Sequence, residues 1–203
     1  MVWRLDRKIN LIYILLPFIL WPITFIILRD IFLISMAIST GLIGILSITL
    51  YRDRISLGGL RGLLIIGPPG SIILYFIFYI GDILADILYL SGYIDEVYVM
   101  VGRAGDKSIL FAGLVWIGFM EELYWRGGLQ GLFRDVYGSK YPWIYSSILY
   151  STVHISTLNP ILIISSLIIG LFLGLISEYH GVAATIFIHV SWLILILLIY
   201  PLR

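Results

Sequence analysis

The chain has 203 residues, 61% of them hydrophobic and 12% charged, with a net charge of +1 and a mean hydropathy of +1.05. Soluble domains are about 45–50% apolar and about 25% charged, so this composition excludes a soluble globular protein. The near-neutral charge comes without a basic stripe, so we expect no nucleic-acid partner. Because the chain contains no cysteine, disulfides, thiol catalysis and zinc–thiolate sites are also excluded.

Seven apolar segments follow one another along the chain, and a helix of about 20 residues is enough to cross a bilayer. They cover residues 9–28, 31–50, 62–80, 108–133, 141–158, 160–178 and 181–200. The first follows the short basic flank MVWRLDRKIN without a small-residue cleavage signal, so we interpret it as a retained span. The sequence therefore predicts an all-α, polytopic integral membrane helix bundle in the lipid bilayer, with about seven transmembrane helices.

The long stretch at residues 81–107 does not have the character of a span. Acidic residues occur among its apolar residues at irregular intervals: Asp82, Asp86, Asp95, Glu96 and Asp106. Two interpretations stay open, an interfacial amphipathic helix or loop lying over the bundle and an ordinary extramembrane connector.

The distribution of lysine and arginine predicts the orientation, because these residues collect on the cytoplasmic side of membrane proteins. With seven spans and a cytoplasmic N-terminus, eight cations fall inside: Arg4, Arg7, Lys8, Arg52, Arg54, Arg61, Arg134 and Lys140. Four fall outside: Arg29, Arg103, Lys107 and Arg203. We therefore expect a protein of the cell membrane with its N-terminus in the cytoplasm. This orientation requires the third segment, interrupted by GPPG at 67–70, to cross completely.

Three charges lie together in the apolar stretch FMEELYWRGG, at residues 119–128. Ionisable groups within a membrane cost about 2.5–3.5 kcal/mol each on insertion scales, so they usually face a bundle interior or a watery cavity and mark function. Helical spacing puts Glu122 and Arg126 on one face, where they can pair. Glu121 points about 100° away. We expect one ionised, paired glutamate and one that accepts and returns a proton, as general acid–base catalysis requires. A structural salt bridge between helices is the alternative.

Two histidines lie in later apolar segments, His154 four residues after Tyr150 and His189 in the last span. Each alone is more often a hydrogen-bonded core residue. Together with the glutamates they put ionisable groups on three apolar helices, as a water-holding site requires. Peptide hydrolysis needs a base that deprotonates water and donors for the oxyanion. Two histidines and a glutamate are also a plausible set of zinc ligands, but the chain has no HExxH motif. We therefore expect no metal and no other cofactor.

Three motifs carry a family resemblance. EELYWRG, which starts at Glu121, is similar to the EExxxR motif of the CAAX-protease and bacteriocin-processing family of intramembrane glutamate-type proteases, which includes the Ras-converting CAAX endopeptidases. YSTVH resembles its second motif, with Tyr150 where phenylalanine is usual, and HVSWL resembles its third. The resemblance covers residues 108–200. It divides the chain into N-terminal membrane helices with the 81–107 segment, residues 1–107, and a catalytic four-helix core, residues 108–203.

The resemblance implies a role for each residue. Glu121 would activate a water that His154 holds, and His189 would stabilise the oxyanion. Glu122 and Arg126 would form the supporting pair, with Tyr150 beside them. The family resemblance thus implies a metal-independent, CAAX prenyl protease-like endopeptidase that hydrolyses a peptide bond near the membrane. Its partner would be a peptide or protein substrate, and a prenylated C-terminal peptide is one option.

One position departs from the family pattern. The third motif has asparagine or aspartate four residues after its histidine, where this chain has Leu193. Losing one oxyanion donor costs about 10²–10³ in rate in a soluble protease. Ser191, Thr185, Asn159 or a backbone N–H are the possible substitutes. The departure favours an alternative function, a non-catalytic membrane scaffold or immunity-type relative that binds a peptide or a partner helix. A transporter is disfavoured because no internal repeat is present.

Overall fold

The structure is a computed structural model that describes residues 6–202, so Arg4 and Arg203 of the predicted topology lie outside the described residues. Its α-helices are α1 (Arg7–Pro22), α2 (Phe32–Tyr51), α3 (Gly67–Ile87), α4 (Ser91–Gly102), α5 (Lys107–Glu122), α6 (Gln130–Asp135), α7 (Pro142–Thr152), α8 (Pro160–His180) and α9 (Val182–Ile194). Short π-helical segments are η1 (Ile23–Ile27), η4 (Gly62–Ile66), η5 (Leu123–Leu129) and η7 (Leu195–Ile199). Short 3₁₀ segments are η2 (Arg29–Ile31), η3 (Arg52–Arg54) and η6 (Val153–Thr157). Within 6–202 there is no strand.

Six helical stretches are long and apolar enough to cross a membrane: Arg7–Ile27, Arg29–Arg54, Gly62–Ile87, Lys107–Asp135, Pro160–His180 and Val182–Ile199. The remaining predicted segment, 141–158, is a shorter helix made of α7 and η6. Pro142 begins it, and the left-handed backbone of Leu158 ends it before the Asn159-Pro160 turn. The prediction of an all-α membrane bundle with about seven spans is therefore confirmed, with one of the seven too short to count as a span by length.

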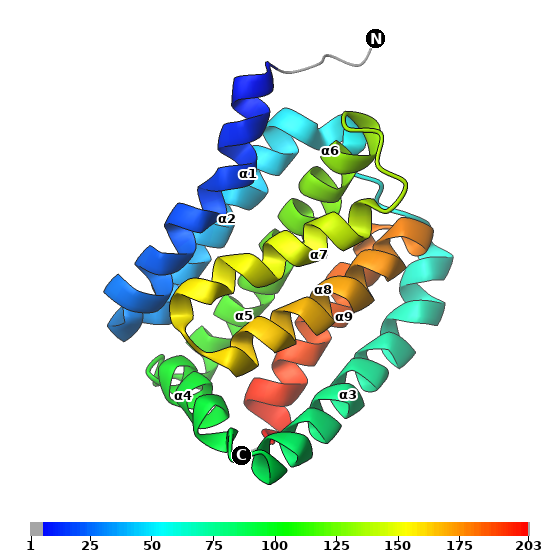
Figure 1. The fold of residues 1–203 in the computed structure, drawn as a ribbon. Helices are drawn as coiled ribbons and strands as arrows, with labels where there is room; N and C mark the ends of the chain where they lie inside the picture. The colour runs from blue at the N-terminus through cyan, green and yellow to red at the C-terminus, as the bar shows by residue number, and fades with distance from the viewer. Residues whose placement is uncertain (1–5, 203) are drawn as a thin grey trace.

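The spans run alternately between two ends of the bundle, so that α1 begins at one end and α9 finishes at the other (Figure 1). Helix α5 lies in the middle, where it packs against α2 and α9. Helices α7 and α8 form an antiparallel pair in front of it. This arrangement brings α5, α7 and α9, which carry the three motifs, around one central volume.

Small residues let these helices approach closely, as is usual in membrane bundles. A Cβ added to Gly118 of α5 would lie 3.0 Å from Val190 and 3.1 Å from Leu193, both on α9. A Cβ added to Gly170 of α8 would lie 2.9 Å from the side chain of Ser147 on α7. The glycines therefore set the separation of the helices that carry the motifs.

The GPPG segment begins α3 and does not break it. Its prolines occupy the first helical positions, where a missing N–H is tolerated. With η4 the helix continues from Gly62 to Ile87 as one candidate span. This helix is therefore long and apolar enough for the full crossing that the predicted orientation requires.

The 81–107 stretch divides into three parts. Its first residues complete α3, a turn follows, and α4 then lies across one end of the bundle before α5 begins. Asp106 caps α5 by accepting hydrogen bonds from the backbone N–H groups of Ser108 and Ile109, and these bonds lower the pKa of Asp106. The helix of this stretch outside α3 is thus α4, at one end of the bundle, and its interfacial character stays a prediction.

Candidate active site

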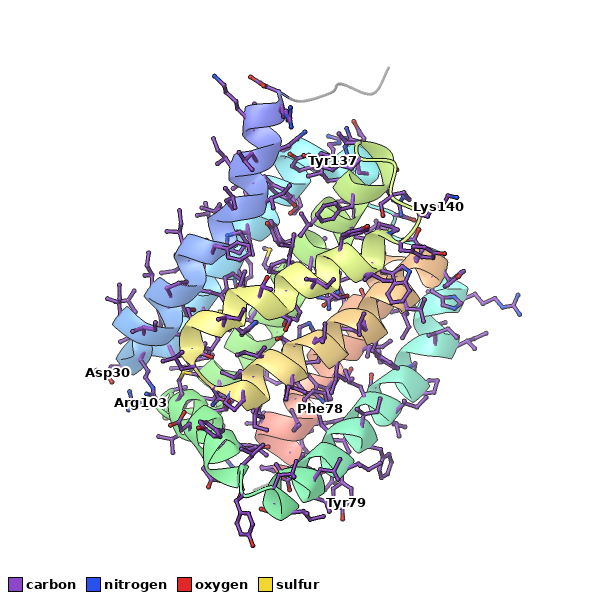
Figure 2. All side chains as sticks on the ribbon, in the orientation of Figure 1. Asp30, Phe78, Tyr79, Arg103, Tyr137 and Lys140 are labelled. Carbon is purple, nitrogen blue, oxygen red and sulfur yellow. The ribbon has the colours of Figure 1, made fainter. Side chains whose placement is uncertain are left out.

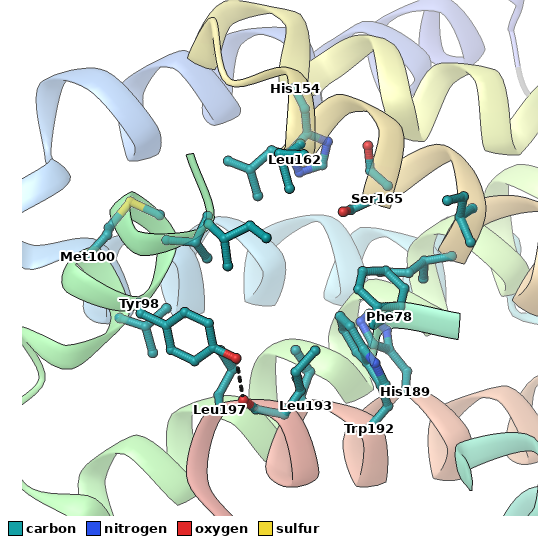
Figure 3. A pocket seen from close by; sticks show the side chains of 18 of the residues that line it. Phe78, Tyr98, Met100, His154, Leu162, Ser165, His189, Trp192, Leu193 and Leu197 are labelled. Atoms are coloured by element: carbon teal, nitrogen blue, oxygen red, sulfur yellow. Dashed lines mark hydrogen bonds between the residues drawn. The ribbon is translucent and has the colours of Figure 1, made fainter. Parts of the chain in front are cut away.

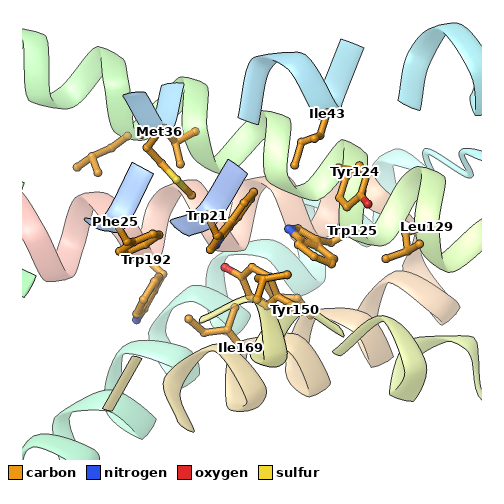
Figure 4. Close-up of a cluster of buried hydrophobic side chains, with 14 of the residues drawn as sticks. Trp21, Phe25, Met36, Ile43, Tyr124, Trp125, Leu129, Tyr150, Ile169 and Trp192 are labelled. Atoms are coloured by element: carbon orange, nitrogen blue, oxygen red, sulfur yellow. The ribbon is translucent and has the colours of Figure 1, made fainter. Parts of the chain in front are cut away.

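The first motif lies where α5 changes its helical form. Helix α5 ends at Glu122, and η5 continues as a π-helix whose seven residues are all buried. Such π segments in a helix are frequent at functional sites. An aromatic cluster surrounds η5 (Figure 4), in which Trp125 meets Trp21 edge to face at 5.9 Å and Tyr150 at 5.0 Å between ring centroids. The cluster holds the wider helical turn in place.

Glu122 and Arg126 form the ion pair that their spacing predicts. Arg126 Nη1 lies 3.0 Å from Glu122 Oε1, and at most 1% of either side chain is exposed. Arg126 Nη2 also donates to the carbonyl of Ile169 at 3.3 Å, and the guanidinium lies 4.9 Å from the ring centre of Tyr150. A buried charge pair of this kind requires such extra partners to offset its loss of hydration.

His189 lies between the two glutamates. Its Nδ1 is 2.8 Å from Glu122 Oε1, and its Nε2 is 3.8 Å from Glu121 Oε2. The ring is 1% exposed. With a proton on Nδ1 the ring donates to Glu122, which fixes its orientation and leaves Nε2 toward Glu121. The structure therefore brings the third motif into contact with the first.

The two carboxylate oxygens of Glu121 differ in their hydrogen bonding. Tyr150 donates its hydroxyl proton to Glu121 Oε2 at 3.1 Å. The other oxygen, Oε1, is buried and has no hydrogen-bond partner among residues 6–202. A buried polar atom of this kind calls for an explanation, and a reacting water is one.

His154 has partners on both ring nitrogens. Its Nδ1 lies 2.8 Å from the carbonyl oxygen of Tyr150, to which it donates, and its Nε2 accepts from the indole N–H of Trp21 at 3.1 Å. A neutral imidazole has one donor and one acceptor, so both are used. Sequence reasoning missed Trp21, which lies 133 residues away. The one available signal was that a buried indole N–H needs an acceptor.

The predicted residues meet at one cavity of about 270 Å³. Glu121, Tyr150, His154 and His189 all line it, and the rest of the wall is mostly apolar. Figure 3 shows His154 and Ser165 on one side and His189, Trp192 and Phe78 on the other. The arrangement puts a carboxylate, two imidazoles and a phenol at the surface of a largely apolar chamber.

Leu193 also lines this cavity, at the position where the family has asparagine or aspartate. Ser191, Thr185 and Asn159 are not among its described lining residues. Thr185 donates to the carbonyl of Val182, and the amide of Asn159 donates to the carbonyl of Tyr93.

A donor that sequence reasoning missed is the neighbouring indole of Trp192. Trp192 lines the cavity, and its Nε1 is buried without a hydrogen-bond partner in the described part of the chain. An indole N–H is a hydrogen-bond donor only, so it can stabilise a developing oxyanion but cannot accept a proton.

Across residues 6–202, no group of three or more histidine, aspartate or glutamate side chains has the arrangement of a metal site.

The comparison with family models decides the assignment. A model described as type II CAAX prenyl endopeptidase Rce1-like matches residues 105–195. Residues 105–195 belong to the Rce1-like family. The resemblance carried by the three motifs is therefore confirmed. Comparisons with curated proteins and with solved structures gave no match.

The Rce1-like region does not enclose the cavity by itself. It contributes Glu121, Tyr150, His154 and His189, from α5, α7, η6 and α9. Asp82 of α3 also lines the cavity, from outside this region. Residues before 105 complete the wall with apolar and aromatic side chains, which include Phe25, Phe32, Met36, Phe78, Ile94 and Met100. The protein is thus an integral membrane protein in which a region that matches a CAAX-type protease family shares its cavity with helices outside the match.

Proposed function

We propose that the protein is an intramembrane endopeptidase that uses Glu121 to activate the water that attacks a peptide bond. The observation that carries this proposal is the single apolar cavity lined by Glu121, Tyr150, His154 and His189. General bases act within hydrogen-bond reach of the proton that they abstract. Oε1 of Glu121 has no hydrogen-bond partner within residues 6–202, and it is the proposed contact for a water in the cavity.

The proposed reaction moves one proton twice. Glu121 takes a proton from the water while the water oxygen bonds to the scissile carbonyl carbon, which gives a tetrahedral oxyanion. The C–N bond then breaks as Glu121 returns the proton to the leaving amine nitrogen. Tyr150 holds Oε2 of the carboxylate and so fixes which oxygen faces the water.

His189 is the proposed oxyanion donor, and Glu122 positions it. When the ring is protonated, Nδ1 donates to Glu122 and Nε2–H is left for the oxyanion. Arg126 balances the charge of Glu122 and keeps this carboxylate from acting as a second base. Trp192 is the proposed second donor, in place of the side chain that Leu193 lacks.

His154 is the proposed partner of Glu121 in holding the water, as the family resemblance implies. In this conformation the indole of Trp21 occupies its Nε2. Holding the water therefore requires Trp21 to release that nitrogen when the substrate is bound. The apolar cavity wall favours a substrate with an apolar group beside the scissile bond, and a prenylated peptide is one such substrate.

The test uses the purified full chain with quenched fluorogenic peptides, both farnesylated and unmodified at a C-terminal CAAX sequence. We expect cleavage by the wild type, and its loss in Glu121→Gln, in His154→Ala and in His189→Ala. Glu178→Gln is the matched control, because Glu178 lies outside the cavity lining, and it should keep the wild-type rate. Elution as a single species and a cooperative thermal unfolding transition would show that the variants fold. Cleavage retained in Glu121→Gln would refute the proposal, and inhibition by chelators with rescue by zinc would replace it with the metal alternative.

The second candidate is a non-catalytic relative that binds a peptide or a partner helix. Leu193 at the cavity wall and the two satisfied nitrogens of His154 favour it. Leu193→Asn restores the family's residue without changing the other motifs. A wild type without activity and a Leu193→Asn variant with activity would establish this candidate. Equal activity in both would exclude it.

A further inference from the structure

Helix α1 lies outside the Rce1-like region and has two different faces. From residue 9 to its end, its exposed residues are all apolar: Ile9, Leu11, Ile12, Leu15 and Ile19. Its buried residues recur at helical spacing: Asn10, Tyr13, Pro17 and Trp21. In Figure 2, side chains of α1 project both away from the bundle and toward it. The buried face therefore brings an amide, a phenol and an indole into the bundle.

Pro17 leaves one backbone carbonyl of α1 without its helical partner. In an α-helix the N–H of residue 17 would donate to the carbonyl of Tyr13, but proline has no N–H. The hydroxyl of Tyr124 donates to this carbonyl instead, at 2.7 Å. Tyr124 belongs to η5, the π-helix that also contains Arg126. A proline in α1 thus creates an acceptor that binds the helix of the first motif.

The side chain of Tyr13 contacts η5 a second time, at Gly128. A Cβ added to Gly128 would lie 2.0 Å from the Tyr13 hydroxyl oxygen, far inside van der Waals contact. That oxygen lies 2.6 Å from Ser47 Oγ on α2. The ring centroid of Tyr13 lies 4.4 Å from that of Tyr51 and 4.7 Å from that of Tyr124. Because these contacts fix the phenol in place, only a glycine at position 128 leaves room for it.

The two contacts lie on either side of Arg126. Tyr124 is two residues before it, and Gly128 is two residues after it. Arg126 pairs with Glu122, whose Oε1 lies 2.8 Å from Nδ1 of His189. A movement of η5 relative to α1 would therefore shift the guanidinium from Glu122, and this carboxylate is what orients the imidazole.

We propose that Tyr13 is a positioning residue: it holds η5 on both sides of Arg126 and thereby orients His189 through the buried ion pair. Tyr13, Tyr124 and Gly128 are not among the described residues that line the cavity, so this role is exerted through η5 and not through contact with a substrate. The consequence for catalysis rests on the proposed function, whereas the effect on the orientation of His189 does not.

The orientation of His189 is tested by ¹⁵N NMR of the purified full chain, labelled in its three histidines. A ring nitrogen that carries a proton differs in chemical shift from one that does not, and His189→Gln identifies the two His189 signals. In Gly128→Ala the new Cβ meets the Tyr13 hydroxyl, so these signals should shift. The double variant Tyr13→Phe with Gly128→Ala lacks that hydroxyl and should return them to their wild-type positions.

Two further variants complete this measurement. Gly92→Ala is the matched control, because a Cβ at Gly92 of α4 meets no atom within 4 Å, and it should leave the His189 signals unchanged. Tyr124→Phe removes only the hydroxyl that donates to α1, and it should shift the signals even if Gly128→Ala does not fold. His189 signals that stay in place in Tyr124→Phe, or that the double variant does not restore, would overturn the inference.

The consequence for catalysis is measured with the fluorogenic peptides, as rates per folded molecule. Gly128→Ala should lower kcat by about 10²-fold, which is what a misplacement of about 1 Å by a distant mutation can cost in an active site. KM should stay the same, because no residue of the cavity lining is changed. The double variant with Tyr13→Phe should recover most of kcat. A raised KM with an unchanged kcat would contradict a positioning role.

The two measurements separate this inference from the proposed function, because the NMR signals need no catalysis. His189 signals that shift and recover as expected, in a protein without any cleavage, would refute the proposed function alone. Cleavage that is lost in Glu121→Gln but has the wild-type kcat in a folded Gly128→Ala would refute this inference alone.

Discussion

The Rce1-like region and the helices before it contribute to the cavity in different ways. Residues 105–195 supply Glu121, Tyr150, His154 and His189 to its lining, and Glu121 and His189 are hydrogen-bonded to Tyr150 and Glu122 of the same region. Residues 6–104 supply a mostly apolar part of the wall that includes Asp82, the indole N–H that donates to His154, and the helix α4. The residues of the proposed chemistry thus lie in the part that matches a family, whereas the cavity wall is completed by a part that does not.

The largest expected stability effect is inside the Rce1-like region. Arg126→Met leaves Glu122 as a buried charge without its guanidinium partner, and breaking a buried pair in this way costs about 3–5 kcal/mol. The double variant Glu122→Gln with Arg126→Met should recover most of that loss, because neither charge remains. Thermal unfolding in detergent measures both. A double variant no more stable than Arg126→Met would show that the pair is not the source of the effect.

A smaller effect is expected where the two regions touch. Trp21→Phe removes the indole N–H and leaves Nε2 of the buried His154 without its donor, which costs about 1–3 kcal/mol. If His154 holds the reacting water, the same change frees Nε2, so cleavage should be kept or increased while Tm falls. Fluorogenic cleavage and Tm are measured on the same preparation. A loss of cleavage equal to that of His154→Ala would instead make the indole bond part of the working site.

The smallest effect is expected at α4, outside the family match. Tyr98→Phe removes one hydrogen bond to the carbonyl of Ile196, worth about 0.5–1.5 kcal/mol. Because that bond holds α4 over the cavity, thiol modification of Ser165→Cys should become faster. Tyr89→Phe is the control, since Tyr89 is 94% exposed and is not among the lining residues. An unchanged modification rate in Tyr98→Phe would mean that α4 is not held by this contact.

Much of the site follows from local spacing. The pair of Glu122 and Arg126 depends on one turn of one helix, so four residues of sequence are enough to predict it. The same holds for His154 and Tyr150, whose backbone contact also spans four residues. The number and order of the apolar segments follow from composition, because a membrane leaves few alternatives to helices of sufficient length.

The sequence by itself determined the membrane helix bundle, the pair of Glu122 with Arg126 and the family resemblance of the C-terminal part. Tertiary structure alone decided that His189 bridges Glu121 and Glu122 across 67 residues, and that Trp21 bonds His154 across 133. It also decided that η5 is a π-helix and that the cavity extends to the end covered by α4. The physical reason is that these contacts depend on how separate helices pack. Periodicity within one helix describes which face a residue occupies, but not which helix that face meets.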